Sequence, residues 1–167
     1  SGAYFYGGPF LFDNIDEESI LETALCFQLK DITNSKLICG LTDTFNPATG
    51  TATNGVWASV VNGVLTGNTT LTSVASVTST NYTLSIDTWY TLKVNYKFSL
   101  TSPTASIIFT LYSSTMESLW TETILDNIPL SQVLFLTLGI FTTSTTDNFS
   151  LIYIDYLKHN NNDALIR

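Results

Sequence analysis

The chain has 167 residues, of which only 12% are charged, and its 6 basic and 14 acidic residues give a formal net charge of −8. This length fits one domain with a sizeable core. Because lysine and arginine form no cluster, neither nucleic acid nor an anionic membrane is an expected partner. The longest apolar run, Val133 to Phe141, is too short for a spanning helix, so we expect no membrane insertion.

The first segment, residues 1–12, is aromatic and contains a flexible Gly7-Gly8-Pro9 joint. Each ring left in water forgoes roughly 1.5–3 kcal/mol of burial, so this segment is expected to dock on a protein surface. It can form an edge strand of its own sandwich or add a strand to a neighbouring subunit. The candidate intersubunit contacts are Tyr4, Phe5, Tyr6, Phe10 and Phe12.

Residues 13–167 are expected to form a single domain in which apolar and polar residues alternate with the period of a strand. Asp16 to Ser19 carries the only weak helical signal. Turn clusters such as Asn62-Gly63 and Thr66-Gly67-Asn68 separate the strands, which predicts an all-β sandwich or barrel. The clearest predicted strands are Leu21–Lys30, Leu37–Thr42, Gly55–Val61, Tyr82–Ile86, Trp89–Tyr96, Ser106–Tyr112, Leu119–Ile124, Val133–Phe141 and Ser150–Leu157.

Two cysteines, Cys26 and Cys39, lie in a predicted hairpin with a turn at Thr33 to Ser35. If they oppose each other on neighbouring strands, they can form a disulfide in an oxidising compartment. Two buried free thiols fit equally well, because cysteine is among the most buried residue types. The sequence leaves both alternatives open.

Three glycosylation sequons begin at Asn68, Asn81 and Asn148, each in or beside a predicted turn where a glycan can sit on the surface. Trp57 is the candidate glycan contact, because sugars are held by exposed aromatic faces. The alternative for this tryptophan is packing in the core or at a sheet edge.

The last predicted strand is apolar on both faces from Leu151 to Leu157, apart from Asp155. This pattern is typical of a strand in the middle of a sheet that is covered on both sides, or of one that meets a partner. In such a place Asp155 is predicted to be a hydrogen-bonded structural carboxylate.

Residues for catalysis are sparse. His159 is the only histidine and lies in a polar tail, and the cysteines lack zinc-ligand spacing. The acidic residues around Asp16 and Asp43 lack the regular spacing of a calcium loop, and the other carboxylates are too scattered for a glycosidase pair. We therefore expect no enzyme, no catalytic residue, no metal and no cofactor.

Several sequence segments are similar to those of a known family: FQLKDITNSKLICGLTD, NGVWASVVNGVLTGNTT, DTWYTLKVNY, NIPLSQ and LIYIDYLK. Over roughly residues 19–158 the chain resembles the concanavalin-like jelly-roll modules of phage tail fibres, head fibres and virion decorations, which also occur in archaeal surface proteins. The resemblance implies an all-β, two-sheet antiparallel jelly-roll sandwich. It also implies that the domain is a rigid structural unit or a binding head and does not catalyse a reaction.

Two extracellular functions follow as expectations. In the first, the chain is a structural subunit of a virion or filament and its partners are copies of itself. In the second, it is a receptor- or glycan-binding head whose partner is a cell-surface glycan. The low charge favours assembly, because proteins usually protect exposed edge strands with charged side chains.

Overall fold

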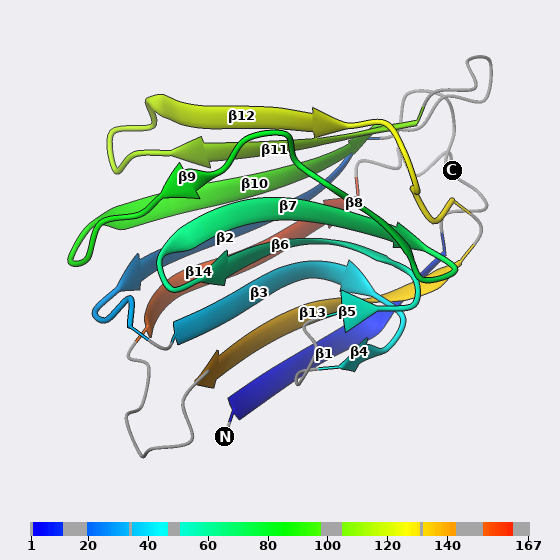
Figure 1. Cartoon of the computed structure of the whole chain (residues 1–167), viewed down its shortest axis with the longest axis horizontal. Helices are drawn as coiled ribbons and strands as arrows, with labels where there is room; N and C mark the ends of the chain where they lie inside the picture. The colour runs from blue at the N-terminus through cyan, green and yellow to red at the C-terminus, as the bar shows by residue number, and fades with distance from the viewer. Residues whose placement is uncertain are drawn as a thin grey trace, which may run out of the picture.

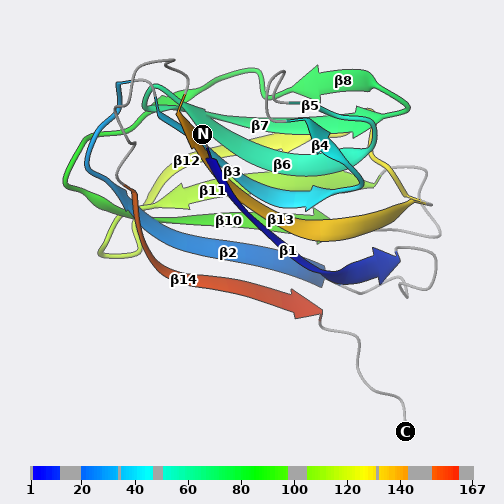
Figure 2. The same ribbon diagram turned by 90° about the horizontal axis from the view of Figure 1, so that it is seen from below.

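The computed structural model describes residues 2–11, 20–33, 35–46, 51–97, 105–130, 132–142 and 152–161. Every helix or strand assigned in this part of the chain is a β-strand, as the period-two alternation predicts. The described residues include no helix with the length and apolar character needed to cross a membrane. Two antiparallel sheets face each other, so the predicted two-sheet sandwich is confirmed (Figures 1 and 2).

The larger sheet has seven strands in the order β1-β13-β3-β6-β7-β8, with β9 paired to β7. The predicted Asn62-Gly63 turn joins β6 to β7, and both residues have the positive φ that a tight hairpin turn of this kind requires. The bounds are β1 (Gly2–Leu11), β3 (Ser35–Thr42), β6 (Gly55–Val61), β7 (Val64–Leu71), β8 (Val74–Val77), β9 (Tyr82–Thr83) and β13 (Val133–Thr142).

The smaller sheet has five strands in the order β12-β11-β10-β2-β14. A separate two-stranded hairpin is formed by β4 and β5, which pair with no other strand of the described ranges. The bounds are β2 (Ile20–Leu29), β4 (Phe45–Asn46), β5 (Thr51–Ala52), β10 (Trp89–Lys97), β11 (Ser106–Tyr112), β12 (Ser118–Ile124) and β14 (Ile152–Asn161).

The main core lies between the two sheets. Along β3, for example, Leu37, Cys39 and Leu41 enter this core, whereas Ile38 lies on the other face. Tyr96, Phe27 and Phe109 are the largest described side chains with no exposed surface. Each large apolar side chain that becomes buried stabilises the fold by roughly 1.5–3 kcal/mol, which makes this core the main source of stability.

A second, smaller cluster covers the outer face of the seven-stranded sheet. Phe45 of the β4–β5 hairpin packs edge-on against Trp57, with ring centroids 6.2 Å apart, and stacks on Phe141 at 6.1 Å. Ile38 and Ala52 complete the cluster. The hairpin is therefore fixed to the sheet by apolar contacts rather than by strand pairing.

The strand prediction is wrong in several details. The strand predicted over Tyr82–Ile86 is β9, which is only Tyr82–Thr83. Thr66 to Asn68 is not a turn, because β7 runs through it without interruption. The hairpin expected around Thr33 is absent, because β2 pairs with β10 and β14, whereas β3 belongs to the other sheet. The connection between β2 and β3 therefore crosses from one sheet to the other.

The last strand, β14, is not in the middle of a sheet. Among the described strands it pairs only with β2, and it forms the margin of the five-stranded sheet, as Figure 2 shows. The register shifts between Ile154 and Tyr156, which places the exposed Asp155 at a bulge. An exposed charge at a bulge is a device that protects an edge strand from pairing. Asp155 therefore does not have the buried structural role that we expected.

The aromatic N-terminal segment forms β1, which pairs antiparallel with β13 at the margin of the seven-stranded sheet. In the register, Tyr4 is opposite Gly139 and Phe5 is opposite Leu138. Of the two alternatives for this segment, the chain adopts the edge strand of its own sandwich. The predicted helical turn at residues 16–19, Phe12 and the sequon at Asn148 lie outside the described residues.

Candidate functional site: a hydroxyl-lined pocket beside the β4–β5 hairpin

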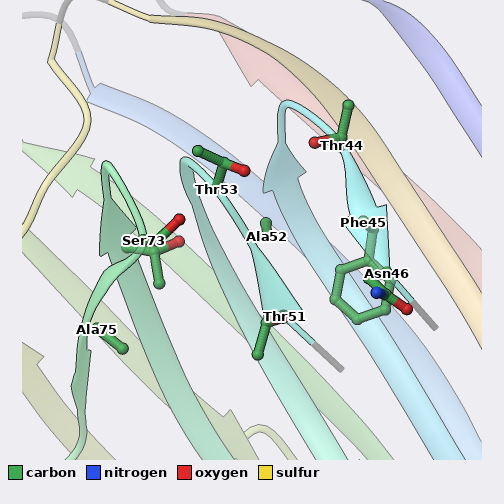
Figure 3. Close-up of a pocket in the computed structure, with 9 residues that line it drawn as sticks. Thr44, Phe45, Asn46, Thr51, Ala52, Thr53, Ser73 and Ala75 are labelled. Atoms are coloured by element: carbon green, nitrogen blue, oxygen red, sulfur yellow. The ribbon is translucent and has the colours of Figure 1, made fainter. Parts of the chain in front are cut away.

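A pocket of about 360 Å³ opens between the β4–β5 hairpin and the β7–β8 turn (Figure 3). One wall comes from β4 and β5, and the other comes from β7, the turn and β8. Phe45 and Ala52 supply apolar surface, and no described lining residue carries a charge. The oxygen-bearing side chains are Thr44, Asn46, Thr51, Thr53, Thr70 and Ser73. We call this site the hydroxyl pocket.

Thr70 is the most deeply buried of the polar residues that line the hydroxyl pocket. It is only 2% exposed, and its Oγ1 atom has no hydrogen-bond partner among the described residues. A buried hydroxyl without a partner costs about 1–3 kcal/mol, and such groups are rare in folded proteins. Thr70 also lines the pocket, so its hydroxyl is the lining group whose hydrogen-bonding capacity the described residues leave unused.

Hydrogen bonds of Asn54 hold the two walls together. Its Nδ2 donates to Asp43 Oδ2 at 2.9 Å, and its Oδ1 accepts from the backbone N of Thr72 at 2.9 Å. The backbone N of Ser73 donates to the carbonyl of Thr53 at 2.8 Å. Thr72 and Ser73 have φ angles of +48° and +67°, which non-glycine residues rarely adopt. The Asn54 bond thus fixes a strained turn, and the walls are pre-organised.

The described lining of the hydroxyl pocket consists of polar uncharged and apolar side chains. The hydroxyl and amide groups can hydrogen-bond to a small uncharged ligand, and the ring of Phe45 can pack against it. Asp43 lies beside the pocket, but its carboxylate accepts from Asn54 and from the backbone N of Thr44 at 2.5 Å. No three His, Cys, Asp or Glu residues are grouped for a metal anywhere in the described ranges.

Trp57, the predicted glycan contact, is only 3% exposed and lies beneath Phe45. The prediction that it presents an exposed face is wrong, because the β4–β5 hairpin covers it. The alternative, packing, is what the structure has. Sequence reasoning noticed Asp43 and Asn46 only as an acidic loop, and it missed Thr70 and Asn54, whose roles depend on the contact between this loop and the β7–β8 turn.

The two cysteines are not paired with each other. Cys26 is half-buried on β2 and Cys39 is buried on β3, so they belong to different sheets, and both thiols are free. The disulfide alternative is therefore not adopted, and the free-thiol alternative is. Burial raises the pKa of the Cys39 thiol to about 12, so this thiol is unreactive near neutral pH.

The described sequons differ in accessibility. Asn68 lies within β7, and its Nδ2 donates to Ser59 Oγ at 3.1 Å. Asn81 lies exposed in the loop before β9. Since a glycan is attached through Nδ2, Asn81 is the better placed of the two, and glycosylation stays a prediction.

Comparison with known proteins agrees with this architecture. Residues 14–155 match the family described as SO2946-like, C-terminal domain. The structure of SO2946 from Shewanella oneidensis MR-1, a protein of unknown function, is similar with a TM-score of 0.66 and 22% identity. The match covers 91% of this chain and 62% of that protein, so the chain spans less than two thirds of its relative.

Two further structures share the fold at low identity. Arcelin-5, a lectin-like defence protein from Phaseolus vulgaris, has a TM-score of 0.57 and 9% identity over 91% of this chain and 73% of its own. Alginate lyase A1-II′, solved with a GGMG substrate, has a TM-score of 0.58 and 11% identity over 90% of this chain and 64% of its own. No curated protein matches the chain in sequence. The chain is a two-sheet antiparallel β-sandwich with the fold of these structures, and it belongs to the SO2946-like, C-terminal domain family.

Proposed function

We propose that this chain binds a neutral carbohydrate in the hydroxyl pocket. The observation that carries the proposal is the buried Oγ1 of Thr70, which lacks a hydrogen-bond partner among the described residues and lines a pocket rich in hydroxyl and amide groups. Sugars present hydroxyl groups that donate and accept, and also apolar C–H faces. Phe45 and Ala52 offer the matching apolar surface.

The shared fold supports this proposal without identifying a ligand. Arcelin-5 is lectin-like, and the alginate lyase was solved with its GGMG substrate. A lyase needs groups that move protons, whereas the described lining of the hydroxyl pocket carries no titratable group. The site therefore favours binding over cleavage.

The test uses Thr70→Val, which removes one hydroxyl with almost no change of shape. Binding is screened on an array of neutral oligosaccharides, and calorimetry then measures the affinity for the best ligand. We expect the affinity to fall by about tenfold, which corresponds to one hydrogen bond of about 1.4 kcal/mol. The variant should be at least as stable as the original when unliganded, because the lost hydroxyl had no partner.

The matched control is Thr123→Val, at an exposed position of β12 on the other sheet, which should leave affinity unchanged. An array without hits, or equal affinity of the Thr70→Val variant and the original chain, contradicts the proposal.

A second proposal is that the chain is a structural subunit of a virion or extracellular filament that assembles through β1. It rests on the place of β1 at the margin of its sheet, where the described residues offer no strand to its outer edge. Unpaired edges invite pairing with another chain. Light scattering after size-exclusion chromatography, on the full chain and on a chain starting at Asp13, tests it. Equal small species in both samples contradict it.

A further inference from the structure

The outer face of the five-stranded sheet carries a row of residues that its sequence pattern did not reveal. In the strand register, Gln28 on β2 is opposite Trp89 on β10 and also opposite Tyr153 on β14. The neighbouring residues Tyr90 and Phe27 are buried in the core, so strand alternation directs this row away from the core. Trp89 is 37% exposed and Tyr153 is 45% exposed.

A second row on the same face continues the aromatic surface. Cys26 is opposite Tyr156 on one side and opposite Thr91 on the other, and Thr91 is opposite Tyr112. Tyr156 is 42% exposed. We call the surface formed by Tyr112, Trp89, Tyr153 and Tyr156 the aromatic platform.

Gln28 lies between the two rings of the first row and is 8% exposed. Its side-chain amide carries two donor hydrogens and an acceptor oxygen. A hydroxylated molecule lying across Trp89 and Tyr153 can exchange hydrogen bonds with this amide.

The charges around the aromatic platform neutralise one another. Lys30 Nζ lies 2.5 Å from Asp87 Oδ1 and 5.3 Å from the ring centroid of Tyr153. Lys93 Nζ lies 3.4 Å from Glu22 Oε2 and 5.9 Å from the ring centroid of Tyr112. On the edge strand, Lys158 lies opposite Ala24, and the exposed Asp155 at the bulge carries the opposite charge. Such a face neither attracts nor repels a charged polymer strongly, which favours a neutral ligand.

We propose that the aromatic platform binds an extended, neutral polysaccharide. Sugar rings stack on Trp89 and Tyr153, and Gln28 hydrogen-bonds to a hydroxyl group between them. This is a second site, on the other sheet from the hydroxyl pocket, and it does not depend on ligand binding there. Two aromatic rings joined by a polar centre suit a repeating chain better than a single terminal sugar.

The experiment measures retention of the full chain on three insoluble neutral polysaccharides: cellulose, chitin and curdlan. Trp89→Ala and Tyr153→Ala should each weaken binding to the retained polymer by about tenfold or more. Gln28→Leu, which keeps the volume and removes the amide, should weaken it by a smaller factor. Leu125→Ala, which changes another exposed apolar side chain at 59% exposure, is the matched control and should bind normally.

Cys26 provides an independent readout, because it lies between Tyr156 and Thr91 in the platform. A soluble fragment of the retained polymer should slow alkylation of Cys26 by iodoacetamide in the original chain but not in Trp89→Ala. Burial keeps Cys39 unreactive in both proteins.

Three outcomes overturn the proposal: retention on none of the polymers, equal retention of the Trp89→Ala variant and the original chain, or a dimer that dissociates on Trp89→Ala. The last outcome would make the platform a contact between copies of the chain. Thr70→Val is included in every assay. If the Thr70→Val variant loses oligosaccharide binding but is still retained on the insoluble polysaccharide, the two sites are separate. If Trp89→Ala has no effect but Thr70→Val does, only the platform proposal fails.

Discussion

Gly40 on β3 lies opposite Trp57 on β6, and a Cβ atom at Gly40 would lie 2.2 Å from the carbonyl oxygen of Val56 and 2.5 Å from the Cα of Trp57. Both contacts are with the backbone, so neither can be relieved by a side-chain rotation. Phe45 packs edge-on against Trp57 on the outer face of these strands, with ring centroids 6.2 Å apart.

Gly40→Ala should therefore destabilise the chain by about 1–3 kcal/mol, because overpacking in a well-packed region forces the backbone to move. Chemical denaturation followed by tryptophan fluorescence measures the change. Gly139→Ala is the control, since its Cβ would meet only the ring of Phe141, at 2.6 Å. We expect a smaller loss there, and an equal or larger loss would contradict this account.

The hydrogen bonds of Asn54 predict that the stability of an Asn54→Asp variant depends on pH. Asn54→Asp places a second carboxylate 2.9 Å from Asp43 Oδ2 and removes the donor. At pH 7 we expect a loss of about 1–3 kcal/mol in the free energy of unfolding. As the pH falls, one proton shared by the two carboxyl groups restores a donor, so the loss should shrink.

Asn127→Asp is the matched control for this change. Asn127 Nδ2 donates to Ser76 Oγ at 2.8 Å, and the serine hydroxyl can rotate to donate to a new carboxylate. Denaturation at pH 7 and pH 4 should show a pH-dependent loss for Asn54→Asp only. The same loss at both pH values would mean that the charge pair is not its cause.

Glu122 on β12 should titrate below its ordinary range. Hydrogen bonds from the hydroxyls of Thr80 and then Ser79 lower the pKa of Glu122, because both donate to the charged carboxylate. A lowered folded-state pKa means that the stabilising contribution is present above the unfolded-state pKa. That contribution is lost as the pH falls through the lowered value.

Carbon-detected NMR titration of the Glu122 carboxyl group measures this pKa. Thr80→Val should raise it toward the ordinary value, whereas Thr80→Ser keeps the hydroxyl and should leave it low. Trp120 Nε1, which donates to Thr80 Oγ1 at 3.1 Å, should lose its partner in the valine variant only. Identical titration curves for both variants would contradict the assignment.

The two thiols should react very differently. With a pKa raised to about 12 by burial, Cys39 should resist iodoacetamide at pH 8, whereas half-buried Cys26 should be alkylated. Intact-mass spectrometry should find one label per folded chain and two per chain in denaturant. A mass that is two hydrogens lower, with no labelling in denaturant, would show a disulfide instead.

Strand content was predictable because side-chain alternation is a local property. Gly55–Val61 and Ser106–Tyr112 have the predicted bounds, since each has an apolar face on the core and turn residues at its ends. β7 was missed because its polar residues resemble turn residues. Within the sheet they bond to one another instead, as Ser59 Oγ and Thr66 Oγ1 do at 3.0 Å.

The candidate sites were not predictable, because each joins residues that are distant in sequence. Thr70 is near Phe45 only because the β4–β5 hairpin packs on the outer face of the seven-stranded sheet. Trp89 and Tyr153 are 64 positions apart in sequence (153 minus 89) and share a row only through Gln28. Exposure follows from the same packing, which buries Trp57 and leaves Trp89 at the surface.

By itself, the sequence determined an all-β chain with strands of alternating pattern, a low surface charge and few groups for catalysis, because these properties depend on composition and on neighbouring residues. Only the tertiary structure decided which sheet each strand joins, that Cys26 and Cys39 are kept apart, and which aromatic rings remain exposed. The physical reason is that strand partners are chosen by packing across the whole sandwich, which no local pattern records.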